Sequence, residues 1–234
     1  MEIPRVRLVS SVVMKWLIGS AAILVIAGAA VELIRFYTGH DSLFGLSRLF
    51  DLGQEANIPT FFSALVLLTA SALLTIISVA KRQSGAEYLK HWVILAVGFF
   101  YLAVDEAGQI HELLILPIRE LLGRYSQGIF YFAWVVPGIG IIAILAFTFF
   151  RFWSSLDRAT RIYFAVGGLL YIGGAVGIEM VDGLVAAKYG KDNLLYNMLV
   201  VIEEGMEMSG VIVFITGLLH YLRDHAPRVD LEVS

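Results

Sequence analysis

Residues 91–112 read HWVILAVGFFYLAVDEAGQIHE, and this stretch joins a long apolar run to a polar end. The apolar run is typical of a membrane-spanning helix, which needs roughly 20 mostly apolar residues. The polar side chains that end it are Asp105, Glu106, Gln109, His111 and Glu112. Because ionisable side chains are costly inside a bilayer, their presence at membrane depth indicates a functional site.

The composition of the whole chain is that of a membrane protein. Its 234 residues are 59% hydrophobic and 16% charged, whereas soluble domains have roughly 45–50% apolar and about 25% charged residues. Cysteine is absent, which excludes disulfides, iron–sulfur clusters and thiolate metal sites. The net charge of −3 and the lack of a basic tract exclude nucleic acid as a partner and leave the lipid bilayer as the expected surroundings.

Six apolar windows are long enough to cross a membrane. Their continuity predicts helices rather than barrel strands, in which apolar and polar residues alternate. No linker or low-complexity tract separates them, so we expect residues 1–234 to form one all-α bundle of six transmembrane helices. The predicted spans are about 16–36, 57–80, 90–112, 127–150, 162–184 and 195–221.

The distribution of lysine and arginine predicts the orientation of this bundle. Eleven of the 17 basic residues fall on the side that holds both termini and the loops at 81–90 and 151–161. Because cytoplasmic loops are enriched in positive charge, we expect a multi-pass protein of the plasma (inner) membrane with cytoplasmic N- and C-termini. On the opposite side, the amphipathic segments 42–50 and 113–123 are expected to lie as short helices along the outer interface.

Acidic residues of three predicted spans fall at one depth. With a rise of ~1.5 Å per residue, Asp105, Glu179 and Glu207 lie on the order of 22–27 Å from the cytoplasmic edge. On a continuous helix Asp105 would share its face with Gln109, and His111 would point about 120° away. The candidate cation ligands are Asp105, Glu106, Gln109, His111, Glu112, Glu179, Asp182, Glu203, Glu204 and Glu207, with Glu32 and Glu55 as weaker candidates.

These acids need positive charge that the chain itself barely supplies, since Arg35 is the basic residue best placed to reach them. The carboxyl groups must therefore be protonated, lie in a water-filled crater or hold bound cations. Oxygen ligands with at most one imidazole favour a divalent Ca²⁺, Mn²⁺, Mg²⁺ or Fe²⁺ ion as cofactor. Zn²⁺ is a weaker candidate, because zinc usually recruits more histidine or cysteine.

The first functional hypothesis is metal or cation transport. In it, an outward-facing carboxylate cluster binds a divalent metal or exchanges a cation for protons. The sequences VDEAG (104–108) and IEEGM (202–206) are faintly similar, as the two halves of an inverted repeat would be. Against a permanent pore, the cytoplasmic halves of the third, fifth and sixth spans are almost wholly apolar.

An outer-leaflet enzyme is the second hypothesis, in which a metal-bound water acts on a lipid or amphiphile. No known metal-hydrolase or serine-hydrolase motif is present, so the sequence identifies no catalytic residue. The third hypothesis is a non-catalytic ion sensor or a subunit of a membrane complex. The uncharged span at 127–150 would then face lipid or a second copy of the chain in a homo-oligomer.

Overall fold

The structure is a computed structural model that describes residues 10–54, 56–123 and 127–225. Every regular element in these ranges is helical, which confirms the predicted all-α class. Five helical stretches in them are long and apolar enough to cross a membrane. They are α1 (Ser10–Thr38), α3 (Ile58–Gln83), α4 (Leu89–Gly108), α6 (Val135–Ser155) and the continuous stretch formed by α7 (Arg158–Ile172), the π-helical η5 (Gly173–Ile178) and α8 (Glu179–Tyr189).

The remaining elements are one long helix and several short ones. The long helix, α9 (Leu194–His225), has 32 residues but carries three glutamates along its length, which lowers its apolar character. Short helices form in both segments that the sequence analysis expected to be helical, 42–50 and 113–123. They are η1 (Leu43–Gly45) with α2 (Leu46–Phe50), and η2 (His111–Leu114) with α5 (Ile115–Leu122), and a further turn is η4 (Gly128–Phe130).

Three predicted span boundaries differ from the observed ones. The span expected at 90–112 ends at Gly108, because Gln109 adopts a left-handed backbone with φ 51°. The span expected at 127–150 begins only at Val135, since a turn at Gly128 with φ 64° precedes it. The span expected at 162–184 is longer at both ends, and Asp157 begins it by accepting a hydrogen bond from the Thr160 N–H.

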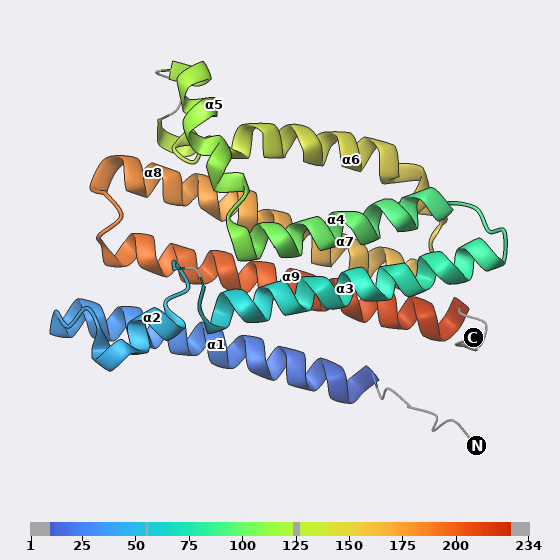
Figure 1. Ribbon diagram of the computed structural model, residues 1–234, viewed down its shortest axis with the longest axis horizontal. Coiled ribbons are helices and arrows are strands. Elements are labelled where there is room, and N and C mark those ends of the chain that lie inside the picture. The colour runs from blue at the N-terminus through green and yellow to red at the C-terminus, as the bar shows by residue number, and fades with distance from the viewer. Residues whose placement is uncertain (1–9, 55, 124–126, 226–234) are drawn as a thin grey trace.

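Helix α9 lies in the middle of the bundle, where it contacts α1, α3 and α7 (Figure 1). The contact with α7 depends on glycines that repeat seven residues apart and so share one helix face. A Cβ on Gly167 would lie 2.7 Å from the Gly210 carbonyl oxygen, and a Cβ on Gly210 would lie 2.6 Å from the Tyr171 nitrogen. One heptad further, a Cβ on Gly174 of η5 would lie 2.8 Å from the Glu203 carbonyl oxygen, and a Cβ on Gly217 of α9 would lie 2.7 Å from Tyr163 Cβ. Small residues therefore let the two backbones touch.

Apolar and acidic side chains occupy opposite halves of the bundle. The half that holds the start of α1 and the end of α9 (Figure 1) is filled by fully buried side chains such as Leu74, Trp92 and Leu218. Aromatic rings close this half further, with Trp92 packed against Phe152 and Tyr221. The acidic residues of α4, α8 and α9 lie toward the other end, and the buried polar side chains of the apolar half include Ser71 and Ser78, whose hydroxyl groups donate to main-chain oxygens.

Gly210→Ala is expected to destabilise the protein, because the new methyl group would meet the backbone of α7. Overpacking of this kind costs about 1–3 kcal/mol, and the melting temperature of the purified protein in detergent should fall accordingly. Gly168→Ala is the matched control, since a Cβ at Gly168 meets nothing within 4 Å. Equal melting temperatures for the two variants would contradict the proposed backbone contact.

Candidate functional site

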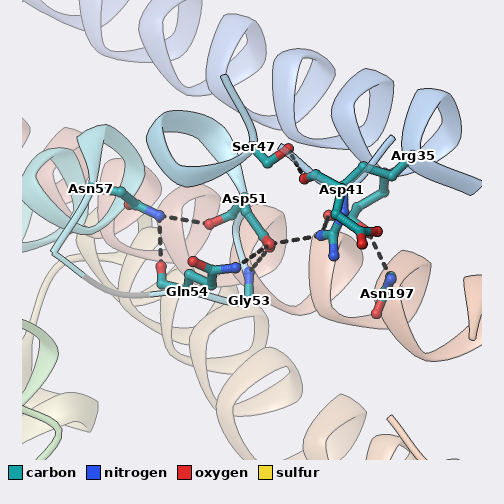
Figure 2. A network of polar contacts seen from close by, with 9 residues as sticks. Arg35, Asp41, Ser47, Asp51, Gly53, Gln54, Asn57 and Asn197 are labelled. Atoms are coloured by element: carbon teal, nitrogen blue, oxygen red, sulfur yellow. Dashed lines mark hydrogen bonds and ion pairs between the residues drawn. The ribbon is translucent and has the colours of Figure 1, made fainter. Parts of the chain in front are cut away.

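One group of polar side chains joins α1 to α9 and to the loop before α3, and we call it the Arg35 network (Figure 2). Arg35 Nη1 donates to Glu32 Oε1 at 2.8 Å and to Asp51 Oδ2 at 2.9 Å. The other oxygen of Glu32 accepts a hydrogen bond from Asn197 Nδ2 of α9 at 2.6 Å. One guanidinium therefore bridges two buried carboxylates that belong to different segments.

Hydrogen bonds within the loop complete the Arg35 network. Asp51 Oδ1 accepts from the Gly53 N–H at 2.9 Å, and Asp51 Oδ2 also accepts from Gln54 at 3.0 Å. Asn57 donates to the main-chain oxygens of Asp51 and Gln54, while its own side-chain oxygen caps α3 at the Thr60 N–H. All these oxygens have donors, so the network is suited to fastening the loop rather than to binding a ligand.

The Arg35 network accounts for the weaker candidate ligands only in part. Glu32 lies in it with both carboxylate oxygens bonded, and Glu55 lies outside the described residues. Sequence reasoning identified Arg35 as a partner but missed Asp51, Asn57 and Asn197. For the loop residues, the available signal was the sequence DLGQEAN (51–57), which holds two acids and two amides within one short connection.

A second group, the carboxylate cluster, is formed by acidic residues of α4, α8 and α9. Charge interactions connect its members across all three helices. Its members are Asp105, Glu106, Glu179, Asp182, Glu203, Glu204 and Glu207.

One edge of the carboxylate cluster is a row of hydrogen-bonded side chains. The chain reversal at Gln109 brings His111 back to Asp105, where its main-chain N–H donates at 2.7 Å and its ring Nδ1 lies 2.9 Å from Oδ2. The His111 ring packs on Trp134 with centroids 4.8 Å apart, and Trp134 Nε1 donates to Glu179 at 2.8 Å. Two of the acids thus have a donor.

These contacts correct the expectation drawn from a continuous helix. His111 does not point away from Asp105 but bonds to it, because α4 ends three residues earlier. Gln109 shares no helix face with Asp105, since it is the residue that reverses the chain. Glu112 is exposed and acts on His111 and Glu179 through its charge.

Asp182 stands out because it is buried beside another acid. Asp182 is only 1% exposed, and apart from the Glu203 carboxyl group no donor in the described part of the chain reaches its carboxylate oxygens. Its side chain interacts with that of Glu203, an acid that in turn interacts with Glu179 and Glu207. A buried carboxylate whose neighbour is another carboxylate requires a proton or a cation between them.

The π-helical segment η5 adjusts where the acids of α8 point. A π turn adds one residue to a helix, which rotates every later side chain relative to the earlier ones, and such turns frequently occur at functional sites. Here Glu179 follows the π segment directly and reaches Trp134, while Asp182 reaches Glu203. Sequence reasoning missed this turn, for which the small-residue run GGAVG was the available signal.

The geometry gives no support to a site for a divalent metal. Within residues 10–54, 56–123 and 127–225, no three or more histidine, aspartate and glutamate side chains are placed to hold one metal ion. The predicted metal cofactor therefore stays a prediction.

Comparisons with known proteins assign a family but no activity. The sequence model of a family described as "Domain of unknown function (DUF8692)" matches residues 17–222. No curated protein and no solved structure matches the chain.

Arg35→Gln is expected to lower the free energy of unfolding by about 2 kcal/mol. Breaking a fully buried ion pair costs ~3–5 kcal/mol, and the loss is smaller here because the Arg35 side chain is 27% exposed. The loss arises from leaving Glu32 and Asp51 buried without their cation. Thermal unfolding in detergent measures it. Arg48→Gln, at an exposed arginine of α2, is the control and should change the melting temperature little.

His111, outside the membrane-spanning segments, is expected to titrate above the ordinary value of about 6.5. Burial of the ring alone would lower its pKa, but the hydrogen bond and charge of Asp105, with the charges of Glu179 and Glu112, raise it. The resulting stabilisation is complete below about pH 6.5 and is lost as the pH rises through the raised pKa. Asp105→Asn should lower this pKa, as measured by NMR of ¹⁵N-labelled histidine, and an unchanged titration would refute the pairing.

Proposed function

The chain belongs to this family of unknown function, so we infer its activity from the carboxylate cluster. We propose that the cluster exchanges a cation for protons as a step in cation transport. The observation that carries the proposal is Asp182, which is buried at 1% exposure and whose hydrogen-bond partner in the described residues is another acid, Glu203. The other acids of the cluster extend this contact toward α4.

The energetic reason is that two ionised carboxylates cannot remain in contact out of water. At 4 Å and an effective dielectric constant of 20, two like charges repel by ~4 kcal/mol. A shared proton removes the repulsion between Asp182 and Glu203, and a bound cation would do the same. Proton and cation therefore compete for the same pair, which is the elementary requirement of a proton-coupled exchanger.

The geometry favours a small monovalent cation over a divalent metal. Calcium takes six to eight oxygen ligands, and magnesium demands octahedral geometry with several retained waters. In the described ranges the acids form no group of three or more around one point. Divalent Ca²⁺, Mn²⁺, Mg²⁺ or Fe²⁺ stays a weaker version of the proposal, and Zn²⁺ a weaker one still.

The proposed membrane arrangement makes α9 a sixth span with the carboxylate cluster opening to the outside. Its 32 residues extend ~48 Å at 1.5 Å per residue, which exceeds a ~30 Å hydrocarbon core. The described chain begins and ends at one end of the bundle (Figure 1), the end that carries most of the basic residues. Cytoplasmic termini in an inner membrane follow from this distribution.

A second candidate, an outer-leaflet enzyme that acts on a lipid or amphiphile, is favoured by the closed apolar half of the bundle. In the described residues that half is filled by buried apolar side chains, so transport requires a second conformation, whereas an enzyme or an ion sensor does not. Exposed leucines at Leu113, Leu116 and Leu121, in and just before α5, suit contact with acyl chains. The exposed apolar side chains of α6, Phe147 among them, suit lipid or a second copy of the chain.

Proteoliposomes that hold a pH-sensitive dye test the transport proposal. An imposed Na⁺ gradient should drive proton movement with the wild type, and Asp182→Asn or Glu203→Gln should slow it at least tenfold, because each variant removes a titrating oxygen from the pair. Glu120→Gln, at an exposed glutamate of α5, should leave the flux unchanged. Absence of flux in the wild type with Na⁺, K⁺ and Mn²⁺ would remove transport and leave lipid turnover as the next measurement.

A further inference from the structure

A small cavity lies between α3, α4, α7 and α9, beside the carboxylate cluster. Its polar lining consists of Ser63, Glu106, Tyr171 and Glu207, one residue from each helix. Its volume, measured as the space open to the centre of a water molecule, is about 10 Å³. That is close to the minimum of roughly 10–15 Å³ that one water occupies. The cavity thus admits a single small occupant.

Ser63 supplies the independent sign that the cavity has an occupant. The residue is 8% exposed, and its Oγ has no hydrogen-bond partner among the described residues. Other buried serines on the same helix are paired, since Ser71 donates to the Ala96 oxygen and Ser78 to the Leu74 oxygen, each at 2.8 Å. A buried hydroxyl without a partner costs free energy, so an occupant that bonds to Ser63 Oγ stabilises the site.

The charge around the cavity selects a cation over a neutral molecule. The side chains that act most strongly on Glu207 through their charge are Glu204, Glu106, Glu179 and Asp105, all of them acidic. Three of these acids, Glu106, Asp105 and Glu204, also act on Tyr171, together with Glu207. Water would satisfy the hydroxyl groups but would leave this accumulated negative charge in place, whereas a cation offsets it.

We infer that the cavity binds one dehydrated monovalent cation, Na⁺, through oxygens of Ser63, Glu106, Tyr171 and Glu207. The space leaves no room for the waters that Mg²⁺ retains, and four side chains fall short of the six to eight ligands that Ca²⁺ usually takes. Two of the four are neutral hydroxyls, which suits a single positive charge. The inference rests on the proposed function, and it adds a sodium site beside the pair of Asp182 and Glu203 at which proton and cation exchange.

The tightest helix contact in the fold holds this site together. Gly210 approaches the backbone of α7 at Tyr171, which fixes the tyrosine beside Glu207 one turn earlier on α9. Ser63 lies in the second turn of α3, a helix whose start is capped by Asn57. Both positions come from rigid backbone rather than from loops, as a selective ion site requires.

Equilibrium binding of ²²Na⁺ to the full chain in lipid nanodiscs tests the inference. The wild type should bind one ion per chain, and excess unlabelled Na⁺ should displace it far better than K⁺ or Ca²⁺. Ser63→Ala should raise the Kd at least tenfold, and Glu207→Gln should abolish binding. The matched control is Ser154→Ala, because Ser154 is an exposed serine of α6 whose hydroxyl donates to the Phe150 oxygen of its own helix. This variant should bind ²²Na⁺ as tightly as the wild type does. Melting temperatures check that every variant is folded.

Two results would overturn the inference: a folded wild type that binds no ²²Na⁺, or Ser63→Ala binding as tightly as the wild type, which would leave water as the occupant. If either result is found while the cation-driven proton flux is intact, the sodium site is wrong and the proposed exchange at Asp182 and Glu203 still stands. Sodium binding lost in Ser63→Ala without any flux in the wild type supports the site and removes transport instead.

Discussion

The contact between α7 and α9 is the constraint on which the rest of the site depends. Glycines let the two backbones touch, and Gly210 lies against Tyr171 while Gly174 lies against the Glu203 carbonyl oxygen. A side chain at either position would push the helices apart and separate the acids of α8 from those of α9. Packing of small residues, rather than attraction between polar groups, therefore brings like charges together, and the fold itself offsets the cost of their repulsion.

The two polar groups of the protein differ in how completely their members are bonded. In the Arg35 network, both buried acids share one guanidinium, and amide groups supply the remaining donors, so the group fastens α1, the loop and α9 (Figure 2). In the carboxylate cluster, the partner of Asp182 in the described residues is another acid, Glu203, and Ser63 in the cavity beside the cluster has no partner in them. A polar network in which every oxygen has a donor stabilises the fold. A group of acids that lack donors can instead bind protons or cations.

The closed apolar half of the bundle limits what the carboxylate cluster does in this conformation. Fully buried side chains of α3, α4 and α9 fill the space between the cluster and the chain ends. An ion that enters from the cluster end meets Leu67 and Met208 directly beyond the cavity, since both line it. The proposed transport therefore requires a second conformation in which this half opens, whereas an enzyme or a sensor does not.

The sequence by itself determined the membrane character, the helical class and the identity of the acids, because apolar length and the cost of buried charge are properties of local composition. It also indicated that Arg35 is the basic residue best placed to pair with the acids. Only the tertiary structure decided which acids are bonded and which are not. A one-residue reversal at Gln109 turned His111 toward Asp105, and a π turn aimed Asp182 at Glu203. Both changes alter the direction in which later side chains point, and they depend on how neighbouring helices pack. The residue spacing of one ideal helix therefore cannot predict them.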